Sequence, residues 1–300
     1  MNAIEITNLS KSFRGMYAVN KLNMTVPIGA IYGFIGENGS GKSTTEKLIC
    51  GLLVPDQGEI KLFGRNYTDA GVRVRVGALI ENAGCFPNSS VYANLKMQAI
   101  NLGIENIDEE IMRVLKIVRM EDNSKLKFKS CSLGMKQRIG IAMALLGNPA
   151  LLILDEPING LDTDGMRIMR EILVDISKNH NTTILISSHI LGELEKIATH
   201  YGIIRRGGMI QELTAKEMEG RCRVFVELKT KDLNKSKEIL RLKFKDVRQE
   251  NDYLRVYDVE DTESIVSHLL ENGQTISQIK KNKIGLEEYY IELMSSKEVE

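Results

Sequence analysis

The sequence predicts an α/β protein whose core is a largely parallel sheet. Three continuous apolar runs read IYGFIG, LLILD and TTILISSH, at residues 31–36, 151–155 and 182–189. Runs of this kind are typical of strands covered on both faces, as in parallel sheets. Helical patterns lie between them, and this alternation is that of an α/β fold.

Alternating apolar and polar residues predict a second, antiparallel layer near the first apolar run. AIEITNLSKSF at residues 3–13, KLNMTVP at 21–27 and GEIKLFG at 58–64 have this two-residue period. Residues from about 85 to 150 depart from the α/β alternation and are expected to form a helical insertion. Its segment EEIMRVLKIVRM has apolar residues at helical spacing.

The pattern changes near residue 220, which predicts a main domain over residues 1–220 and a small α+β accessory domain over 221–300. Strand and helix patterns alternate from RVFVELKT to the closing LEEYYIELM. A further strand around residues 246–251 would complete a split βαβ arrangement.

Composition limits the class of protein. The 300 residues carry 40 basic and 40 acidic side chains, and this balance disfavours a nucleic-acid partner. The four scattered cysteines fit neither a metal site nor a disulfide framework, so we expect reduced, mostly buried thiols. No leader pattern and no apolar run of membrane-spanning length is visible, so a soluble, cytoplasmic chain is expected.

The stretch GENGSGKS, residues 36–43, matches the phosphate-binding loop G-x-x-x-x-G-K-[ST]. An apolar strand precedes it, and STTEKLICGLL is expected to continue as a helix over residues 43–53. Backbone amides and the helix N-terminus would face the phosphates. Lys42 is expected to contact the outer phosphates, Ser43 to ligate Mg²⁺, and Thr44 to contact an inner phosphate. The predicted nucleotide-binding residues here are Gly36, Glu37, Asn38, Gly39, Ser40, Gly41, Lys42, Ser43 and Thr44.

Three polar side chains follow apolar strands at positions that suit nucleotide hydrolysis. Asp155 suits the metal's coordination shell, and Glu156 suits orienting or deprotonating an attacking water. His189 would hydrogen-bond the γ-phosphate and the water. Each has an ordinary alternative, a solvated turn for the acids and a packed or surface side chain for the histidine, but together with Lys42 they indicate a site for a nucleotide with Mg²⁺.

The segment CSLGMKQR, residues 131–138, suggests a second anion-binding position. Ser132 is placed to cap the apolar helix LGMKQRIGIAMALLG, which Gly147 and Pro149 would end. Ser132 and Gly134 at this helix start form either a simple cap or a second contact for a phosphate group.

These motifs, in this order and spacing, resemble the ATP-binding subunits of ABC transporters over residues 1 to about 220. The resemblance implies that CSLGMKQR is the signature motif, normally LSGGQ-x-Q-R, so Leu133 and Met135 depart from it. It implies a head-to-tail dimer in which Ser132 and Gly134 of one chain contact the ATP bound by its partner. It also implies that Asp162 belongs to the D-loop between the two sites. Phe13 occupies the position of an adenine-stacking aromatic, although a core aromatic is the alternative.

Glu81, in VGALIENAGCFP, occupies the position of the family's Q-loop glutamine. The resemblance therefore implies a role for Glu81 at the metal and in the catalytic cycle, with neutral drift as the alternative. With SLGMKQR and the closing LEEYYIELM, this glutamate is similar to the bacitracin and lantibiotic export branch. The implied function is an ATPase subunit of an exporter, held at the membrane by a separate permease. A soluble ABC ATPase of translation or DNA repair is the alternative.

Overall fold

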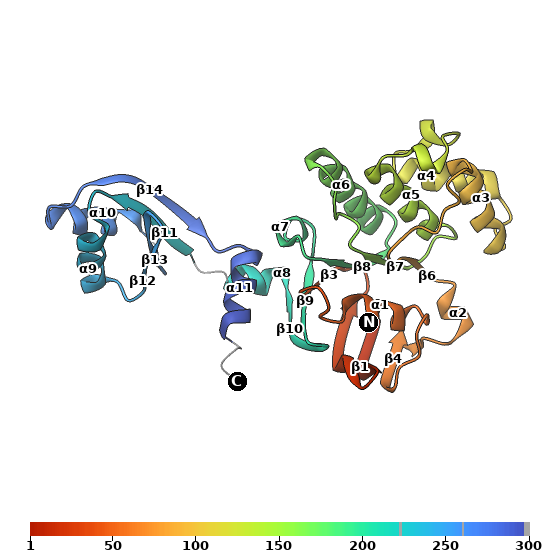
Figure 1. Cartoon of the computed structure of the whole chain (residues 1–300), viewed down its shortest axis with the longest axis horizontal. Coiled ribbons are helices and arrows are strands. Elements are labelled where there is room, and N and C mark those ends of the chain that lie inside the picture. The colour runs from red at the N-terminus through yellow and green to blue at the C-terminus, as the bar shows by residue number, and fades with distance from the viewer. Residues whose placement is uncertain (222–223, 260, 297–300) are drawn as a thin grey trace. The chain divides into compact units, whose positions relative to one another are not determined.

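The computed structural model describes residues 1–221, 224–259 and 261–296 (Figure 1). The chain divides into two compact units, Met1–Ala215 and Lys216–Glu300. Within the described part of the chain, no helix combines the length and the apolar character that crossing a membrane requires.

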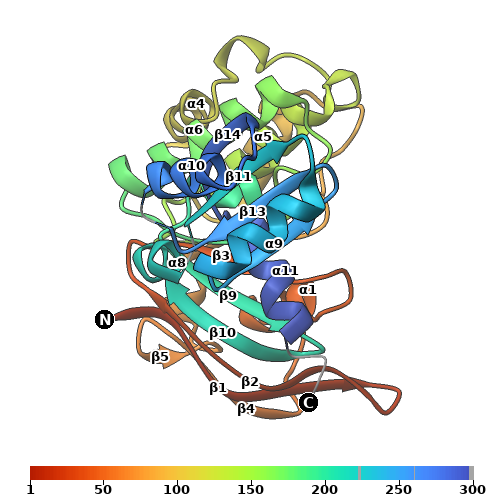
Figure 2. The same cartoon turned by 90° about the vertical axis from the view of Figure 1, so that its left-hand side faces the viewer.

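The predicted antiparallel layer is present in the first unit. Its four strands have the order β2-β1-β4-β5, and β1, β2 and β4 lie side by side (Figure 2). Their bounds are Asn2–Phe13 for β1, Met16–Pro27 for β2, Gln57–Leu62 for β4 and Arg65–Asn66 for β5. The alternating side chains of this sheet bury one face, and buried leucines such as Leu9 stabilise the fold by about 2 kcal/mol each.

A six-stranded sheet confirms the predicted parallel core. The strand order is β10-β9-β3-β8-β7-β6, and every neighbouring pair is parallel except β10 with β9. The carboxyl ends of β3, β7 and β8 therefore meet at one edge. The bounds are Ile31–Ile35 (β3), Val76–Leu79 (β6), Leu151–Asp155 (β7), Thr183–Ser188 (β8), His200–Arg205 (β9) and Gly208–Thr214 (β10).

The helix after the phosphate loop is shorter than predicted. Helix α1 spans Lys42–Ile49 instead of continuing to Leu53, because Gly51 adopts a φ of 68° that ends the helix. The other helices beside the sheets are α2 (Ala70–Arg73), α6 (Thr163–Asn179) and α7 (Leu191–Leu194).

The predicted helical insertion is also present, and its helices lie together in yellow and green in Figure 1. It contains α3 (Val91–Asn101), α4 (Ile107–Ile117) and α5 (Leu133–Leu145), with short 3₁₀ turns at Glu121–Asn123 and Phe128–Ser130. The Ser132 hydroxyl caps α5 as expected, by accepting from the Met135 amide at 3.3 Å.

The second unit is a split βαβ arrangement with an additional helix. After α8 (Ala215–Arg221), four antiparallel strands have the order β12-β13-β11-β14, and α9 and α10 pack with them around one apolar core. Strand β12 is the one expected around residues 246–251. The bounds are Val224–Thr230 (β11), Leu233–Lys243 (α9), Val247–Glu250 (β12), Tyr253–Tyr257 (β13), Thr262–Glu271 (α10), Ile276–Lys283 (β14) and Leu286–Ser296 (α11).

The expectation of mostly buried thiols is corrected by the structure. Cys50 and Cys85 are partly exposed, and only Cys131 among the described cysteines is buried. All three are free thiols, as expected, while Cys222 lies outside the described residues. Both partly exposed thiols border surface cavities, which the sequence pattern alone does not reveal.

Candidate functional site

The phosphate loop joins the end of β3 to the start of α1 in a conformation that requires glycine. Gly39 and Gly41 have φ values of 79° and 110°. A Cβ atom on Gly41 would lie 2.4 Å from the carbonyl oxygen of Ala18, and one on Gly36 would lie 2.6 Å from that of Ile204. The loop backbone is thus packed against neighbouring backbone, and side chains at these glycines are excluded.

The first turn of α1 supplies hydrogen-bond donors for an anion. The first amide to bond within the helix is that of Thr45, which donates to the carbonyl of Gly41 at 2.9 Å. The preceding amides of Lys42, Ser43 and Thr44 have no acceptor in the helix, since a helix start leaves such groups unpaired. Ser43 and Thr44 are half-buried, and Glu37, Asn38 and Gly39 are exposed. The loop therefore has the donor set that a polyphosphate needs.

Lys42 is held by its own loop. Its buried ammonium group donates to the carbonyl oxygens of Gly36 at 2.7 Å and Glu37 at 3.1 Å. An ammonium group has three protons, so one remains for an anion. Beside it, the buried hydroxyl of Ser40 has no hydrogen-bond partner among the described residues.

The ends of β7 and β8 bring the predicted acidic residues and the histidine together. Asp155 and Ser187 are directly paired in the parallel register, and the Ser187 hydroxyl donates to Asp155 Oδ1 at 2.8 Å. The amide of Glu156 donates to the Ser187 hydroxyl at 3.1 Å and to the Ser187 carbonyl at 3.2 Å. Ser187 thus fixes both acids at the sheet edge where the phosphate loop begins.

Glu156 and His189 form a hydrogen-bonded pair. Glu156 Oε2 lies 2.8 Å from His189 Nδ1 and also accepts from the His189 amide at 3.3 Å. Glu156 has a φ of 49°, a left-handed conformation that is uncommon outside glycine and is often found at functional positions. The carboxylate is therefore held by its neighbours in one orientation, as a general base must be.

Glu81 contacts a lysine of α1. Its carboxylate lies 2.5 Å from the Lys47 ammonium group, and the two side chains are 62% and 31% exposed. Glu81 also has a left-handed φ of 63°. Glu81 replaces a neutral glutamine and so brings a negative charge to this loop, and Lys47 balances that charge. A role of Glu81 at a metal remains a prediction.

Phe13 lies at the end of β1 with 45% of its surface exposed. The Lys11 ammonium group is 5.6 Å from its ring centroid. This exposure excludes the core-aromatic alternative and leaves the ring accessible for stacking. A role with adenine remains a prediction.

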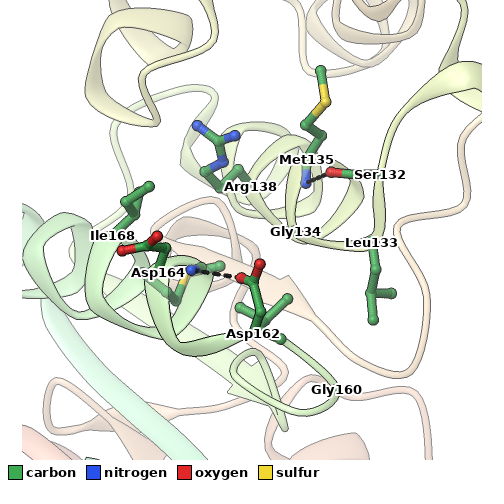
Figure 3. Close-up of a pocket in the computed structure, with 12 residues that line it drawn as sticks. Ser132, Leu133, Gly134, Met135, Arg138, Gly160, Asp162, Asp164 and Ile168 are labelled. Carbon is green, nitrogen blue, oxygen red and sulfur yellow. Dashed lines mark hydrogen bonds between the residues drawn. The ribbon is translucent and has the colours of Figure 1, made fainter.

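The second group of predicted residues lines a cavity of about 420 Å³ between α5 and α6 (Figure 3). Ser132 and Gly134 contribute from the start of α5, and Asp162 contributes from the start of α6. The Asp162 carboxylate accepts from the Gly165 amide at 2.8 Å and so caps α6. Among the described residues, none from the phosphate loop lines this cavity.

Similarity to known proteins accords with this geometry. The family model described as ABC transporter matches residues 19–159. The bacitracin transport ATP-binding protein BcrA of Bacillus licheniformis is 37% identical over 298 residues, which cover 97% of each chain. The chain belongs to the ABC transporter ATP-binding family. The lantibiotic transport ATP-binding protein SrtF of Streptococcus pyogenes is 41% identical over 217 residues, 72% of this chain and 92% of that protein.

Solved structures of ABC ATPases share the fold of this chain. The structure of cbiO1 from Clostridium perfringens, part of the ABC transporter complex cbiONQ, has a TM-score of 0.67 at 26% identity, over 73% of this chain and 91% of that chain. A dimeric ATP-binding cassette in a post-hydrolysis state with ADP and Pi has a TM-score of 0.65 at 20% identity, over 71% and 98% of the two chains. As a member of the ABC transporter ATP-binding family, this chain binds and hydrolyses ATP.

Two departures from the usual ABC motifs have visible structural settings. Leu133, in the signature, is 49% exposed and lines both the cavity of Figure 3 and a neighbouring cavity of about 360 Å³. Glu81 and Cys85 also line that neighbouring cavity. Through Leu133, the signature therefore shares a cavity with the segment around Glu81.

Three residues of the ABC site were not singled out from the sequence. Ser187 links the two acids, Lys47 pairs with Glu81, and Glu46 lies beside Asp155 in the interior. The only sequence signal was for Glu46, an acidic residue within a helix that must pack against the sheet. The contacts of Ser187 and Lys47 depend on strand order and loop position, which no local pattern contains.

Proposed function

We propose that this chain is the ATP-hydrolysing subunit of an exporter for peptide antibiotics of the bacitracin or lantibiotic type. The observation that supports it best is the match to BcrA along 97% of both chains, which therefore includes most of residues 216–300. The match to SrtF covers 217 residues, close to the length of the first unit alone. Within this proposal, a bacitracin-type substrate is favoured over a lantibiotic.

The proposed chemistry assigns each placed residue a role. Lys42 and the amides of the first turn of α1 bind the β- and γ-phosphates, and Glu156 accepts a proton from the attacking water. His189 orients Glu156 through the 2.8 Å contact. Ser43 and Asp155 are the residues that would hold Mg²⁺, whose bound charge offsets that of the phosphates. Glu81, which pairs with Lys47, is a third residue that would offer an oxygen to the metal.

A second copy of the chain completes the proposed site. The residues that line the cavity beside Ser132 and Gly134 are separate from the phosphate loop, and we propose that a second chain brings the two groups to one nucleotide. The Ser132 hydroxyl accepts from Met135, and its own proton remains for a phosphate oxygen. The head-to-tail dimer places this donor over the partner's γ-phosphate, with Asp162 at the junction.

The permease is proposed to bind a groove beside Glu81. A cavity of about 500 Å³ lies between the end of α1, β6 and α3, and Leu52, Ile80 and Asn82 are among its lining residues. Leu52 is 64% exposed. Val74, which lies in sequence between the lining residues Arg73 and Val76, is 75% exposed. Asn82 also lines the cavity that contains Glu81. The groove thus offers apolar surface to a permease segment next to the loop that senses the nucleotide.

Leu52→Asp tests this surface. A charge in the groove should abolish copurification with the permease while nucleotide binding by the isolated chain persists. Leu242→Asp, at a leucine that is 82% exposed in α9 of the second unit, is the matched control and should copurify normally. Normal copurification of Leu52→Asp would contradict the assignment of the groove.

Export is tested in a bacitracin-sensitive strain that expresses the chain with the permease encoded beside it. The minimum inhibitory concentration of bacitracin should rise several-fold with the wild-type chain and stay at the vector level with Glu156→Gln. Nisin, a lantibiotic, serves as the second substrate. If the complex hydrolyses ATP but protects against neither peptide, the proposed substrate class is wrong.

The alternative of an ABC ATPase in translation or DNA repair is not favoured. BcrA and SrtF are named as transport ATP-binding proteins, and other matched relatives are named as ABC transporter ATP-binding proteins. The formal net charge is zero, which also gives no support to a nucleic-acid partner.

A further inference from the structure

The signature segment contacts the D-loop of its own chain, residues 159–162. A Cβ atom on Gly160 would lie 3.0 Å from Leu133 Cδ2, so this methyl group lies against the Gly160 backbone (Figure 3). A Cβ atom on Gly134 would lie 3.6 Å from Leu161 Cδ2, which is ordinary van der Waals contact. Each segment therefore packs a leucine against a glycine of the other, and all four residues line the cavity of about 420 Å³.

Leu133 is the residue that the usual signature motif lacks. That motif has glycine at this position, and glycine has no side chain to reach Gly160. Helix α5 is held in the fold by other residues, because Ile139 and Ile141 are 0% exposed, whereas Leu133 is 49% exposed. The contact with Gly160 is thus a property of this chain's signature and not a requirement of its core.

The turn that carries Gly160 begins at the proposed catalytic base. The amide of Asn159 donates to the Glu156 carbonyl oxygen at 3.1 Å. Gly160 has a φ of 74°, and Glu156 itself has a φ of 49°. Left-handed residues persist only where the surrounding structure holds them, so this turn is a fixed unit. A displacement of Gly160 is therefore passed to the backbone of Glu156.

We propose that Leu133 is a positioning residue that links the signature to Glu156 of the same chain. This inference rests on the proposed head-to-tail dimer, in which Ser132 of this chain contacts the nucleotide of its partner. When the partner's nucleotide fixes the start of α5, Leu133 holds the turn at Gly160. The turn in turn holds Glu156 for hydrolysis of the chain's own nucleotide. Leu133 contacts neither nucleotide in this role.

A double-mutant cycle tests the contact. Gly160→Ala adds a methyl group 3.0 Å from Leu133 Cδ2, closer than carbon atoms pack, and also places alanine at a left-handed φ. Leu133→Ala removes the clash but leaves the backbone strain, so the strain cancels when the two backgrounds are compared. The measured quantity is the rate of phosphate release by the complex with the permease at saturating Mg-ATP.

The expected rates follow from the contact. Gly160→Ala should slow hydrolysis in the wild-type background, and in the Leu133→Ala background its effect should be smaller by at least about twofold. Leu133→Ala alone should be slower than the wild type by roughly 2- to 30-fold, the range for residues that couple two sites. Leu133→Met keeps a side chain of similar volume that can reach Gly160, and should retain most of the wild-type rate.

Two further measurements separate positioning from a structural role. A structural defect would lower nucleotide binding and the thermal unfolding midpoint together with the rate. Leu133→Ala does not alter the phosphate loop, so the chain without its permease should bind a fluorescent ATP analogue with the wild-type affinity. Its unfolding midpoint should stay close to that of the wild type. Leu102→Ala, at a leucine that is 50% exposed and is not among the residues described as lining the cavity, is the matched control and should hydrolyse ATP normally.

The outcomes that contradict the inference are distinct. Equal fold-losses from Gly160→Ala in both backgrounds would show that the two positions act independently and would overturn the role of Leu133. A Leu133→Met variant as slow as Leu133→Ala would also overturn it, and this comparison carries the test should Gly160→Ala not fold. If Glu156→Gln stays monomeric at saturating Mg-ATP, the proposed two-chain site fails first. If it dimerises and the cycle is additive, only the inference on Leu133 fails.

Discussion

Glu156→Gln isolates the chemical step of ATP hydrolysis. The amide is nearly the same shape as the carboxylate, and its oxygen can still accept the His189 amide, now 3.3 Å from Glu156 Oε2. The left-handed φ of 49° is set by backbone contacts with Ser187, which the substitution does not touch. We therefore expect a folded protein whose unfolding free energy changes by less than about 1 kcal/mol.

The loss should appear in the rate. An amide cannot take the proton of the attacking water, and removal of a positioned base slows catalysis by about 10² to 10⁴-fold. That factor corresponds to about 3 to 5 kcal/mol of transition-state stabilisation. Nucleotide affinity should be unchanged, because the substitution does not alter Lys42 or the first turn of α1, which are proposed to bind the phosphates. ATP should then remain bound and hold the two chains together.

Two assays check these expectations. Phosphate release under saturating Mg-ATP measures the rate, and light scattering during size-exclusion chromatography measures the dimer fraction. Glu105→Gln, an exposed glutamate outside the site, is the matched control and should behave as the wild type. An undiminished rate in Glu156→Gln would remove Glu156 from the mechanism. A purely monomeric variant at saturating Mg-ATP, with and without the permease, would refute the two-chain site.

Three further predictions concern Lys42 in the phosphate loop, the ion pair between Glu81 and Lys47, and the ion pair between Lys11 and Asp56. Lys42→Ala should weaken ATP binding roughly 100-fold, from the loss of a charge-assisted hydrogen bond, and tight binding in a fluorescence titration would contradict the loop assignment. Glu81→Gln should alter the ATPase rate of the permease complex and leave the dimer fraction unchanged. Its stability cost should stay below about 1 kcal/mol, since the pair with Lys47 is exposed, and denaturant titration measures this. The hydrogen bond from Lys11, followed by those from Ser12, lowers the pKa of Asp56 to about 2. The ionised Asp56 therefore stabilises the fold above about pH 4, and this contribution is lost as the pH falls toward about 2. Urea titrations should show the unfolding free energy of the wild type falling toward that of Asp56→Asn over this pH range.

The parts of the fold that local chemistry determines were predicted from the sequence. Ile31–Ile35 and Leu151–Asp155 form strands within the runs predicted for them, because uninterrupted apolar runs suit a strand covered on both faces. The cap at Ser132 could be predicted because a serine directly before an apolar helix can accept a hydrogen bond from a free amide of the first turn. In contrast, β2 begins at Met16, five residues before the predicted start at 21, because the register shifts in this part of its pairing with β1 interrupt the two-residue alternation.

The motif residues could be predicted, whereas the contacts that orient them could not. The spacing of the phosphate loop places Lys42 and Ser43, because the chemistry requires that order along the chain. Ser187 reaches Asp155 only because β8 is adjacent to β7 in the sheet, and strand order is a property of the whole fold. Asp162 was assigned to the junction between chains, and the structure adds that it caps α6, a role that its place before Thr163 could have indicated.

Two acidic side chains lie beside or within helix α1 in very different surroundings. Glu46 belongs to the helix, and Glu81 contacts it through Lys47. Glu46 is buried beside Asp155, whereas the next residue, Lys47, is partly exposed and pairs with Glu81. Lys47 is therefore committed to Glu81 and does not neutralise the interior acid. Since α1 begins at the phosphate loop, any shift of this helix on nucleotide binding changes the surroundings of both acids together. The contact between Lys47 and Glu81 therefore joins the segment around Glu81 to the helix that begins at the phosphate loop.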